Sequence, residues 1–380
     1  MEPINLFVPT FRIDETLAEI RDCLERGWTG LGFKTVEFER AWCDYTGLPH
    51  AHFLSSATTG LHLALRLLRE KGEWRDGDEV ITTPLTFVST NHGILHERLT
   101  PIFADVDEYL CLDPDSVAAR IGPRTRAVSF VGLGGNVGRW AEVRALCRER
   151  GIKTILDASH MAGTWVGDRH AGWDADIAVF SFQAVKNLPT ADSGMICCAD
   201  AELDAEARKW SWLGINKDTY SRTLSSGSYK WHYDVEHVGF KYHGNSIMAA
   251  IGLVALRYLE EDNRHRRHLA AQYEQELAGV RGLAVVPIAP GCTPSRHLFQ
   301  ILVEDRDEII VQLNRQGVFP GVHYRDNTIY RMYANAAGSC PRSAHASDRI
   351  ISLPLHLRMS EPEVRRVANA LRGALEGAPA

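Results

Sequence analysis

Two polar residues that directly follow apolar runs are the strongest candidates for chemistry. Asp157 ends the run 154–156, and Lys186 follows the run Ile177–Phe182. If these runs are parallel strands, both side chains lie at the carboxyl edge of the sheet, where α/β enzymes place their chemistry. A lysine and a carboxylate at such an edge suit pyridoxal phosphate (PLP), because the amine condenses with the cofactor aldehyde and the carboxylate keeps the pyridine nitrogen protonated. His160 could then hydrogen-bond the ring hydroxyl.

Each of these residues also has a simpler interpretation. Most lysines are solvated surface groups, and an aspartate after a strand is often only a helix cap. The combination of Lys186 and Asp157 with the motifs described below favours the functional interpretation of both residues.

A phosphate-binding turn is indicated by the segment SSATTG (55–60), which joins a short strand to a helix. Free backbone amides and the positive end of a helix dipole bind anions, and serine or threonine hydroxyls add hydrogen bonds. A plain N-cap is the commoner role of such a turn. Together with Lys186 and Asp157, the segment leads us to predict Ala57 and Thr58 as contacts of the cofactor phosphate.

Composition excludes several classes of function. The 380 residues are 45% hydrophobic and carry a net charge of −6, so nothing indicates nucleic-acid binding. No signal peptide and no apolar run of about 18 residues is found, so we expect neither export nor a membrane span. Eight scattered cysteines without a CxxC pair are typical of reduced thiols in a cytoplasmic protein, and no histidine or cysteine cluster supports a metal. The basic cluster Arg264–His268 is expected to form a solvated helix face.

Strands that alternate with helices must position the candidate residues. Expected strands lie at Glu79–Thr83, Pro101–Asp105, Ala127–Gly132, 154–156 and Ile177–Phe182. This alternation predicts an α/β fold with a mostly parallel, helix-covered sheet in a large lobe. Strand and helix patterns after a long helix predict a smaller C-terminal α/β lobe, and we place the domains at 1–255 and 256–380.

The sequence resembles the DegT/StrS family of PLP-dependent sugar aminotransferases, which have the fold type I architecture. The resemblance covers nearly the whole chain in the family's order. It is carried by LDASHMAGTWVG and DADIAVFSFQAVKNLPTADSGMI around the candidate residues, and by GWTGLGFKTVEFE, SSATTGLHLAL, GDEVITTPLTFVST, GFKYHGNSIMAAIG, GVHY and IISLPLHLRMSEPEV elsewhere.

The resemblance implies amination of a keto group on a nucleotide-linked sugar, with glutamate or glutamine as donor and PLP cycling with pyridoxamine phosphate. Relatives that dehydrate sugars carry histidine at the position of Lys186, so the lysine favours amination. Two alternatives stay open at this point. One is an aminotransferase acting on a keto-cyclitol, and the other is a PLP-binding regulatory protein without turnover.

The resemblance also assigns expected roles around the cofactor. Phe87, otherwise a candidate core residue, is expected to stack on the pyridine ring, and Ser181 is expected to contact the phosphate. Lys241 stands where many relatives have asparagine and is expected to reach the phosphate of the neighbouring subunit in a homodimer with shared active sites.

Substrate contacts are expected from three segments. Trp28 and Thr29 lie in a glycine-rich loop that is near the active site in the family, and His323 and Tyr324 belong to GVHY. Residues 213–231 are expected to form an ordered loop near the pocket. The family usually has a histidine and an aromatic residue where this chain has Gly132 and Gly134, and we expect this difference to open the pocket.

Overall fold

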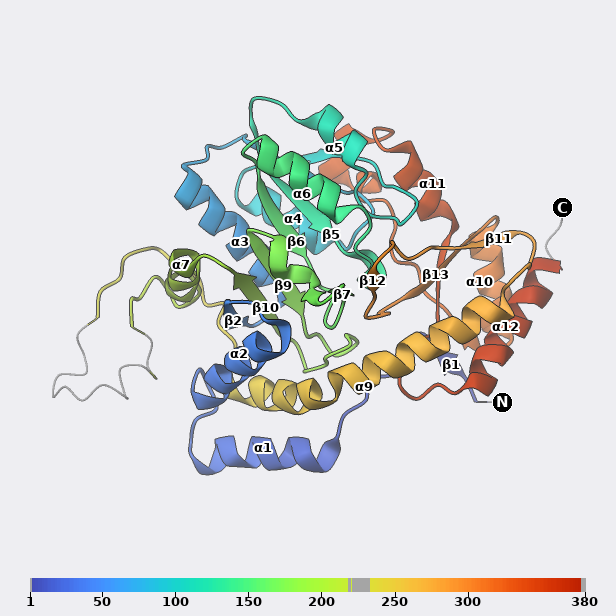
Figure 1. Cartoon of the computed structure of the whole chain (residues 1–380), viewed down its shortest axis with the longest axis horizontal. Coiled ribbons are helices and arrows are strands. Elements are labelled where there is room, and N and C mark those ends of the chain that lie inside the picture. The colour runs from blue at the N-terminus through green and yellow to red at the C-terminus, as the bar shows by residue number, and fades with distance from the viewer. Residues whose placement is uncertain (1, 218–219, 221–232, 377–380) are drawn as a thin grey trace.

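A seven-stranded sheet organises the computed structural model, which describes residues 2–217, 220 and 233–376 (Figure 1). Strand β10 runs antiparallel to both of its neighbours, β2 and β9, and the other neighbouring pairs are parallel. The mostly parallel sheet predicted from sequence is therefore confirmed, whereas β10 was not predicted. In spatial order the strands are β2 (His50–Leu54), β10 (Gly194–Cys198), β9 (Ile177–Ser181), β6 (Lys153–Asp157), β5 (Thr125–Val131), β3 (Glu79–Thr82) and β4 (Thr100–Phe103).

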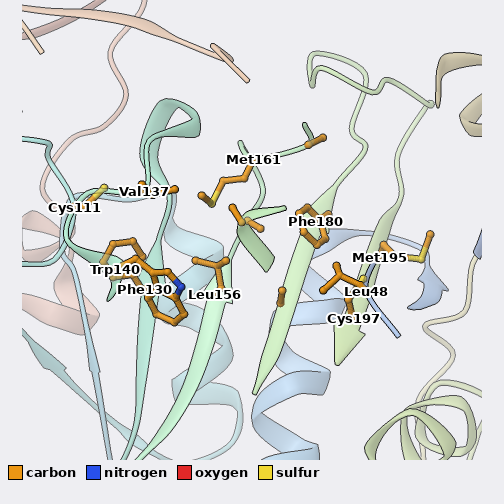
Figure 2. Packing of buried hydrophobic residues seen from close by; sticks show 14 of the residues in the cluster. Leu48, Cys111, Phe130, Val137, Trp140, Leu156, Met161, Phe180, Met195 and Cys197 are labelled. Carbon is orange, nitrogen blue, oxygen red and sulfur yellow. The ribbon is translucent and has the colours of Figure 1, made fainter. Parts of the chain in front are cut away.

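Helices cover both faces of this sheet. On β9, Ala178 and Phe180 point into one buried cluster and Ile177 and Val179 into the other, as the period of two in a strand requires. Figure 2 shows Phe180 among the side chains of the first cluster. The helices on this face are α2 (Phe33–Thr46), α5 (Pro114–Arg120), α6 (Trp140–Glu149) and the first part of α9 (Ser246–Glu276); those on the other are α3 (Ala57–Gly72), α4 (Val88–His96) and α7 (Ala201–Ser211).

Helix α3 shows how the sequence sets these elements. Its N-cap residue is Ser56, whose Oγ accepts a hydrogen bond from the Thr59 amide at 3.1 Å. Leu61, Leu65 and Leu68 recur on one face and are buried. Burial of each such side chain contributes about 1.5–3 kcal/mol, as an upper limit, so packing against the sheet is the main stabilisation of this helix.

A smaller unit contains the C-terminal part of the chain and also its first strand. β1 pairs in parallel with β14, and Ile4 belongs to the cluster formed by the C-terminal elements. The first strand therefore packs with the C-terminal elements, and the division into domains at 1–255 and 256–380 stays a prediction. The elements are β1 (Ile4–Asn5), β11 (Leu283–Val285), β13 (Phe299–Val303), α10 (Arg306–Arg315), β14 (Val318–Phe319), α11 (Pro341–Arg349), β15 (Ile350–Leu353) and α12 (Glu361–Glu376); β7 (Trp165–Val166), β8 (Arg169–His170) and β12 (Cys292–Thr293) form a further small sheet.

Helix α9 runs from one unit to the other (Figure 1). Leu259 packs in the first cluster, whereas Leu269 and Tyr273 pack in the C-terminal one. A boundary near residue 255 stays a prediction. The prediction that Arg264–His268 forms a solvated helix face is wrong for Arg266, because the side chain of this residue is buried.

Helix α1 (Ile13–Glu25) leaves apolar side chains exposed in the single chain. Ile13, Leu17 and Leu24 are all exposed, while Cys23 on the opposite side is buried. Within the described residues, no helix is both long and apolar enough to cross a membrane. The cytoplasmic location stays a prediction, and most of the expected loop 213–231 lies outside the described residues.

Candidate active site

One cavity of about 440 Å³ lies at the carboxyl edge of the large sheet and brings most of the predicted residues together. Asp157 ends β6 and Lys186 follows β9, so the parallel pairing of these two strands places both side chains at the cavity. Its walls include the predicted residues Ala57, Thr58, Phe87, Asp157, His160, Ser181, Lys186, His323 and Tyr324.

The Asp157 carboxylate is held in a fixed orientation. Its Oδ2 accepts a hydrogen bond from the Thr90 hydroxyl at 2.7 Å, and its Oδ1 accepts one from the Ser159 amide at 3.1 Å. Thr90 Oγ1 lies 3.0 Å from the hydroxyl of Thr86. A buried carboxylate with such partners is a preorganised acceptor for a cationic group in the cavity.

The Lys186 amine meets a histidine that the sequence reasoning did not single out. Its Nζ lies 3.5 Å from Nε2 of His297. Burial lowers the pKa of Lys186 to about 8, although the negative charge of Asp157 acts in the opposite direction. Deprotonation of this amine therefore costs far less than it does for a lysine in water.

The tautomer of His297 follows from its hydrogen bonds. Nδ2 of Asn187 donates to the Ser295 carbonyl and to Asn263 Oδ1, both at 2.7 Å, so its Oδ1 must accept from Nδ1 of His297 at 3.1 Å. Nε2 of His297 therefore carries a lone pair directed at Lys186. The Phe7 ring stacks on the imidazole at 5.3 Å, and burial, followed by the charge of Lys186, keeps the pKa of His297 well below its usual range.

His160 is held in the opposite tautomer. Its Nδ1 accepts a hydrogen bond from the Gly134 amide at 3.1 Å, which leaves Nε2 protonated and 3.2 Å from the hydroxyl oxygen of Tyr324. Burial is the main cause that lowers the pKa of His160. The ring is therefore a neutral donor at the cavity wall, as expected for a group that hydrogen-bonds a hydroxyl.

The first turn of α3 offers an anion cradle on another wall. Ala57 and Thr58 open this helix at the cavity, and Ser181 at the end of β9 also lines it. Gly194 permits the close approach, because a Cβ there would lie 2.6 Å from the Ala57 nitrogen. A helix N-terminus with unpaired amides attracts a phosphate.

Aromatic and histidine side chains line the outer part of the cavity. Phe87 is 57% exposed, and its ring lies 6.0 Å from that of Tyr324 at a tilt of 49°. Nδ1 of His323 lies 3.0 Å from the Ser352 hydroxyl, and burial, followed by the charge of Lys186, lowers the pKa of His323 to about 4. His323 is consequently neutral at physiological pH.

Three predicted residues do not line this cavity. Trp28 packs edge-on against Tyr220 at 5.1 Å, and Thr29 is exposed. The Lys241 amine lies over the Trp212 ring, 3.4 Å from its centre, and not at the cradle of its own chain.

The two glycines do not open the pocket as expected. A Cβ at Gly132 would collide with the Met161 side chain, which fills the space beside it, and neither Gly132 nor Gly134 lines the cavity. Met161 belongs to the first buried cluster (Figure 2). The glycines instead accommodate Met161 and supply the amide that fixes His160.

Thr90, Asp192, Phe7 and His297 are among the residues at the site that sequence reasoning did not single out. Thr90 lies three residues after the predicted Phe87 and could have been found by helical spacing. Asp192 lines the cavity on the loop after Lys186. Phe7 and His297 come from distant segments, and no local pattern marks them.

One candidate metal cluster lies elsewhere among the described residues. Glu206, Glu236 and His237 lie close enough together to share an ion. The Lys209 amine already contacts the carboxylates of Glu206 at 2.8 Å and Glu236 at 2.7 Å. An ammonium group therefore already binds both carboxylates, and the cluster carries no metal hypothesis.

A mostly parallel sheet with a lysine and a carboxylate at its carboxyl edge is the arrangement expected of a fold type I PLP enzyme, and the fold matches known aminotransferase structures. The sequence matches the model of the DegT/DnrJ/EryC1/StrS aminotransferase family over residues 12–372, so the chain belongs to this PLP-dependent family and is an aminotransferase.

Three similar proteins cover almost the whole chain. The spore coat polysaccharide biosynthesis protein SpsC of Bacillus subtilis (strain 168) is 34% identical over 376 residues, which cover 96% of this chain and 95% of SpsC. The aminotransferase TlmJ from Streptoalloteichus hindustanus superimposes with a TM-score of 0.90 at 33% identity, over 98% of this chain and 99% of TlmJ. DesI, crystallised in the presence of its TDP-sugar product, has a TM-score of 0.86 at 27% identity, over 99% and 94% of the two chains.

Proposed function

We propose that this aminotransferase transfers an amino group from glutamate or glutamine to a keto group of a nucleotide-linked sugar. The observation that carries the proposal is that three features line one cavity. They are the Lys186 amine, the hydrogen-bonded Asp157 carboxylate and the anion cradle at the start of α3. The TDP-sugar product of DesI and the polysaccharide pathway of SpsC support a sugar substrate.

The cavity residues fit the functional groups of PLP. Asp157 would hold the protonated ring nitrogen, His160 would donate to the ring hydroxyl, and Ser181 with the first turn of α3 would hold the phosphate. Phe87 offers an exposed ring face for stacking. When bound, PLP supplies an electron sink that makes the Cα–H bond of an amino acid acidic.

Proton transfer is assigned to the Nζ atom of Lys186. Its pKa near 8 lets the amine take up a proton and return it at neutral pH, which is the requirement for a general base that later acts as an acid. The lone pair of His297 Nε2 restrains Nζ on one side. His323 and Tyr324 also line the cavity, and we assign contacts with the sugar to them.

A homodimer with shared sites is part of the proposal. The exposed residues Ile13, Leu17 and Leu24 form an apolar stripe of the kind that marks interaction surfaces. Lys241 lies away from the cavity of its own chain, as a residue that serves a partner's phosphate would.

Mixed dimers test this arrangement. A Lys186→Ala subunit is combined with a Lys241→Ala subunit, each inactive or impaired alone. If Lys241 acts across the interface, the mixed dimer contains one intact site and activity returns. If Lys241 acts within its own chain, no intact site forms and mixing restores nothing.

The activity itself is tested by the absorption spectrum of the protein with added PLP, recorded before and after glutamate or glutamine. We expect a visible band that converts to the spectrum of pyridoxamine phosphate, and a suitable keto sugar should restore the first band. Lys186→Ala should show neither conversion nor turnover. Restoration by a keto-cyclitol alone would replace the substrate class, and a band unmoved by either donor would favour a non-catalytic role.

A further inference from the structure

A buried arginine that forms no ion pair among the described residues lies in the middle of α9. Arg266 is 5% exposed, and its Nη1 donates to the Leu355 carbonyl at 2.9 Å. Its Nε is buried and meets no hydrogen-bond acceptor among the described residues. Asp262, which favours the charged form of Arg266, is already bound by both terminal nitrogens of Arg12, at 2.6 and 2.8 Å.

A histidine with free ring nitrogens lies beside this guanidinium. His356 is also 5% exposed, and in the part of the chain that the structure describes neither ring nitrogen is hydrogen-bonded. Burial, followed by the charge of Arg266, lowers the pKa of His356. The backbone of Asn5, which lies near the ring without the geometry of a full hydrogen bond, and the carboxylate of Glu363 act in the opposite direction. The ring is therefore neutral and offers one N–H.

Both side chains line one small cavity behind the catalytic lysine. Residues Phe7–Thr10 and the loop 184–187, with Lys186, form most of its other walls. Its free volume is about 10 Å³, which is room for a single group of about the size of a water molecule. A carboxylate or a phosphate does not fit. The cavity shares only Phe7, Val185 and Lys186 with the proposed cofactor cavity.

We propose that this cavity binds a monatomic anion, with chloride as the physiological ligand. A guanidinium stays charged at any pH that a protein tolerates, and an uncompensated buried charge is strongly unfavourable. A water molecule would satisfy the free N–H groups of Arg266 and His356 but would leave the positive charge unbalanced. A chloride satisfies the N–H groups and balances the charge, and it lies in a cavity whose wall also carries Lys186.

The test compares anions of different size at constant ionic strength. The thermal unfolding midpoint of the wild-type chain saturated with PLP, whose phosphate fills the cradle at the start of α3, is measured while sodium gluconate is replaced by sodium chloride or sodium bromide. We expect a saturable rise of about 2 °C with either halide, because a ligand that binds only the folded state stabilises it. An equal midpoint in all three salts would overturn the proposal.

Variants and crystals locate the effect. Arg266→Met keeps the aliphatic stem and should abolish the halide response, whereas the control Arg257→Met, at a surface ion pair on the same helix, should retain it. Crystals of the wild type grown in bromide should show an anomalous peak between Arg266 and His356. This measurement also decides the matter if Arg266→Met does not fold, because bromide absent from the cavity means that only water fills it. Neither readout depends on turnover, so failure of the proposed function would leave the anion site standing.

Discussion

Replacement of His297 by leucine should lower the pKa of the Lys186 amine in the cofactor-free protein. In the wild type, the lone pair on His297 Nε2 faces Nζ at 3.5 Å and stabilises the ammonium form. Leucine removes this acceptor and leaves the amine against an apolar side chain. The charged form then loses its partner while burial continues to oppose it.

The size of the shift follows from the geometry. A hydrogen bond to a charged group contributes about 1.5–3 kcal/mol, and the separation of 3.5 Å is at the long limit for such a bond. We therefore take the lower end, about 1.5 kcal/mol, which corresponds to about 1.1 pKa units. From about 8 in the wild type, the pKa of Lys186 should fall to about 7 in His297→Leu.

Limited acetylation measures this pKa directly. The cofactor-free protein is treated with acetic anhydride between about pH 6 and pH 10, and the modified Lys186 peptide is quantified by mass spectrometry, since only the neutral amine reacts. His297→Gln is the matched control, because its side-chain oxygen can still accept a hydrogen bond from Nζ and should keep the wild-type midpoint. An unchanged or raised midpoint in His297→Leu would refute the assigned tautomer and role.

Three further substitutions test the site and its surroundings. The pKa of Lys186 is about 8 in the folded chain and 10.5 for the free side chain, so the unfolded state binds more protons between these two pH values. As pH rises through this window, the wild type should gain up to about 3 kcal/mol of stability over Lys186→Met. Denaturant titrations that show a constant difference in stability between the two proteins would contradict this. Asp157→Asn should retain the cofactor but react with the amino donor at least about 100-fold more slowly, equivalent to about 2.7 kcal/mol, in stopped-flow absorbance, whereas an unimpaired rate would remove the carboxylate from the mechanism. Gly132→Ala should cost about 1–3 kcal/mol of stability in urea, because the new methyl group collides with Met161, and the cost should vanish in a Met161→Ala background; additive effects would show that the two sites are not coupled.

Much of the fold follows from local patterns. Short apolar runs predict β6 and β9 and the polar residues that follow them, because parallel strands buried on both faces are continuously hydrophobic. Strand β10 has the same composition, but its antiparallel direction depends on pairing with β2 and β9, which no local pattern encodes. The pairing of β1 with β14 depends likewise on contacts between distant parts of the chain.

Some residues of the candidate site could likewise be predicted from local patterns, and others could not. Asp157, His160 and Lys186 lie within short stretches after two strands, so strand-end reasoning and the family resemblance predict their positions. His297 and Phe7 reach the cavity only through packing between the two units. Their positions depend on a network through Asn187 and Asn263 that spacing along the chain does not reveal.

The pairing of β1 with β14 also sets an order of events during synthesis. Ile4 and Phe7 are synthesised early, but their native neighbours are synthesised late. Ile4 pairs with Val318, and the Phe7 ring stacks on His297. β10 is the last strand of the large sheet along the chain, so all strands of this sheet are synthesised long before His297 and Val318. The nascent chain should therefore expose its leading segment for most of its translation, and the wall behind Lys186 should be completed last, a sequence of events that favours binding of the cofactor after release of the chain.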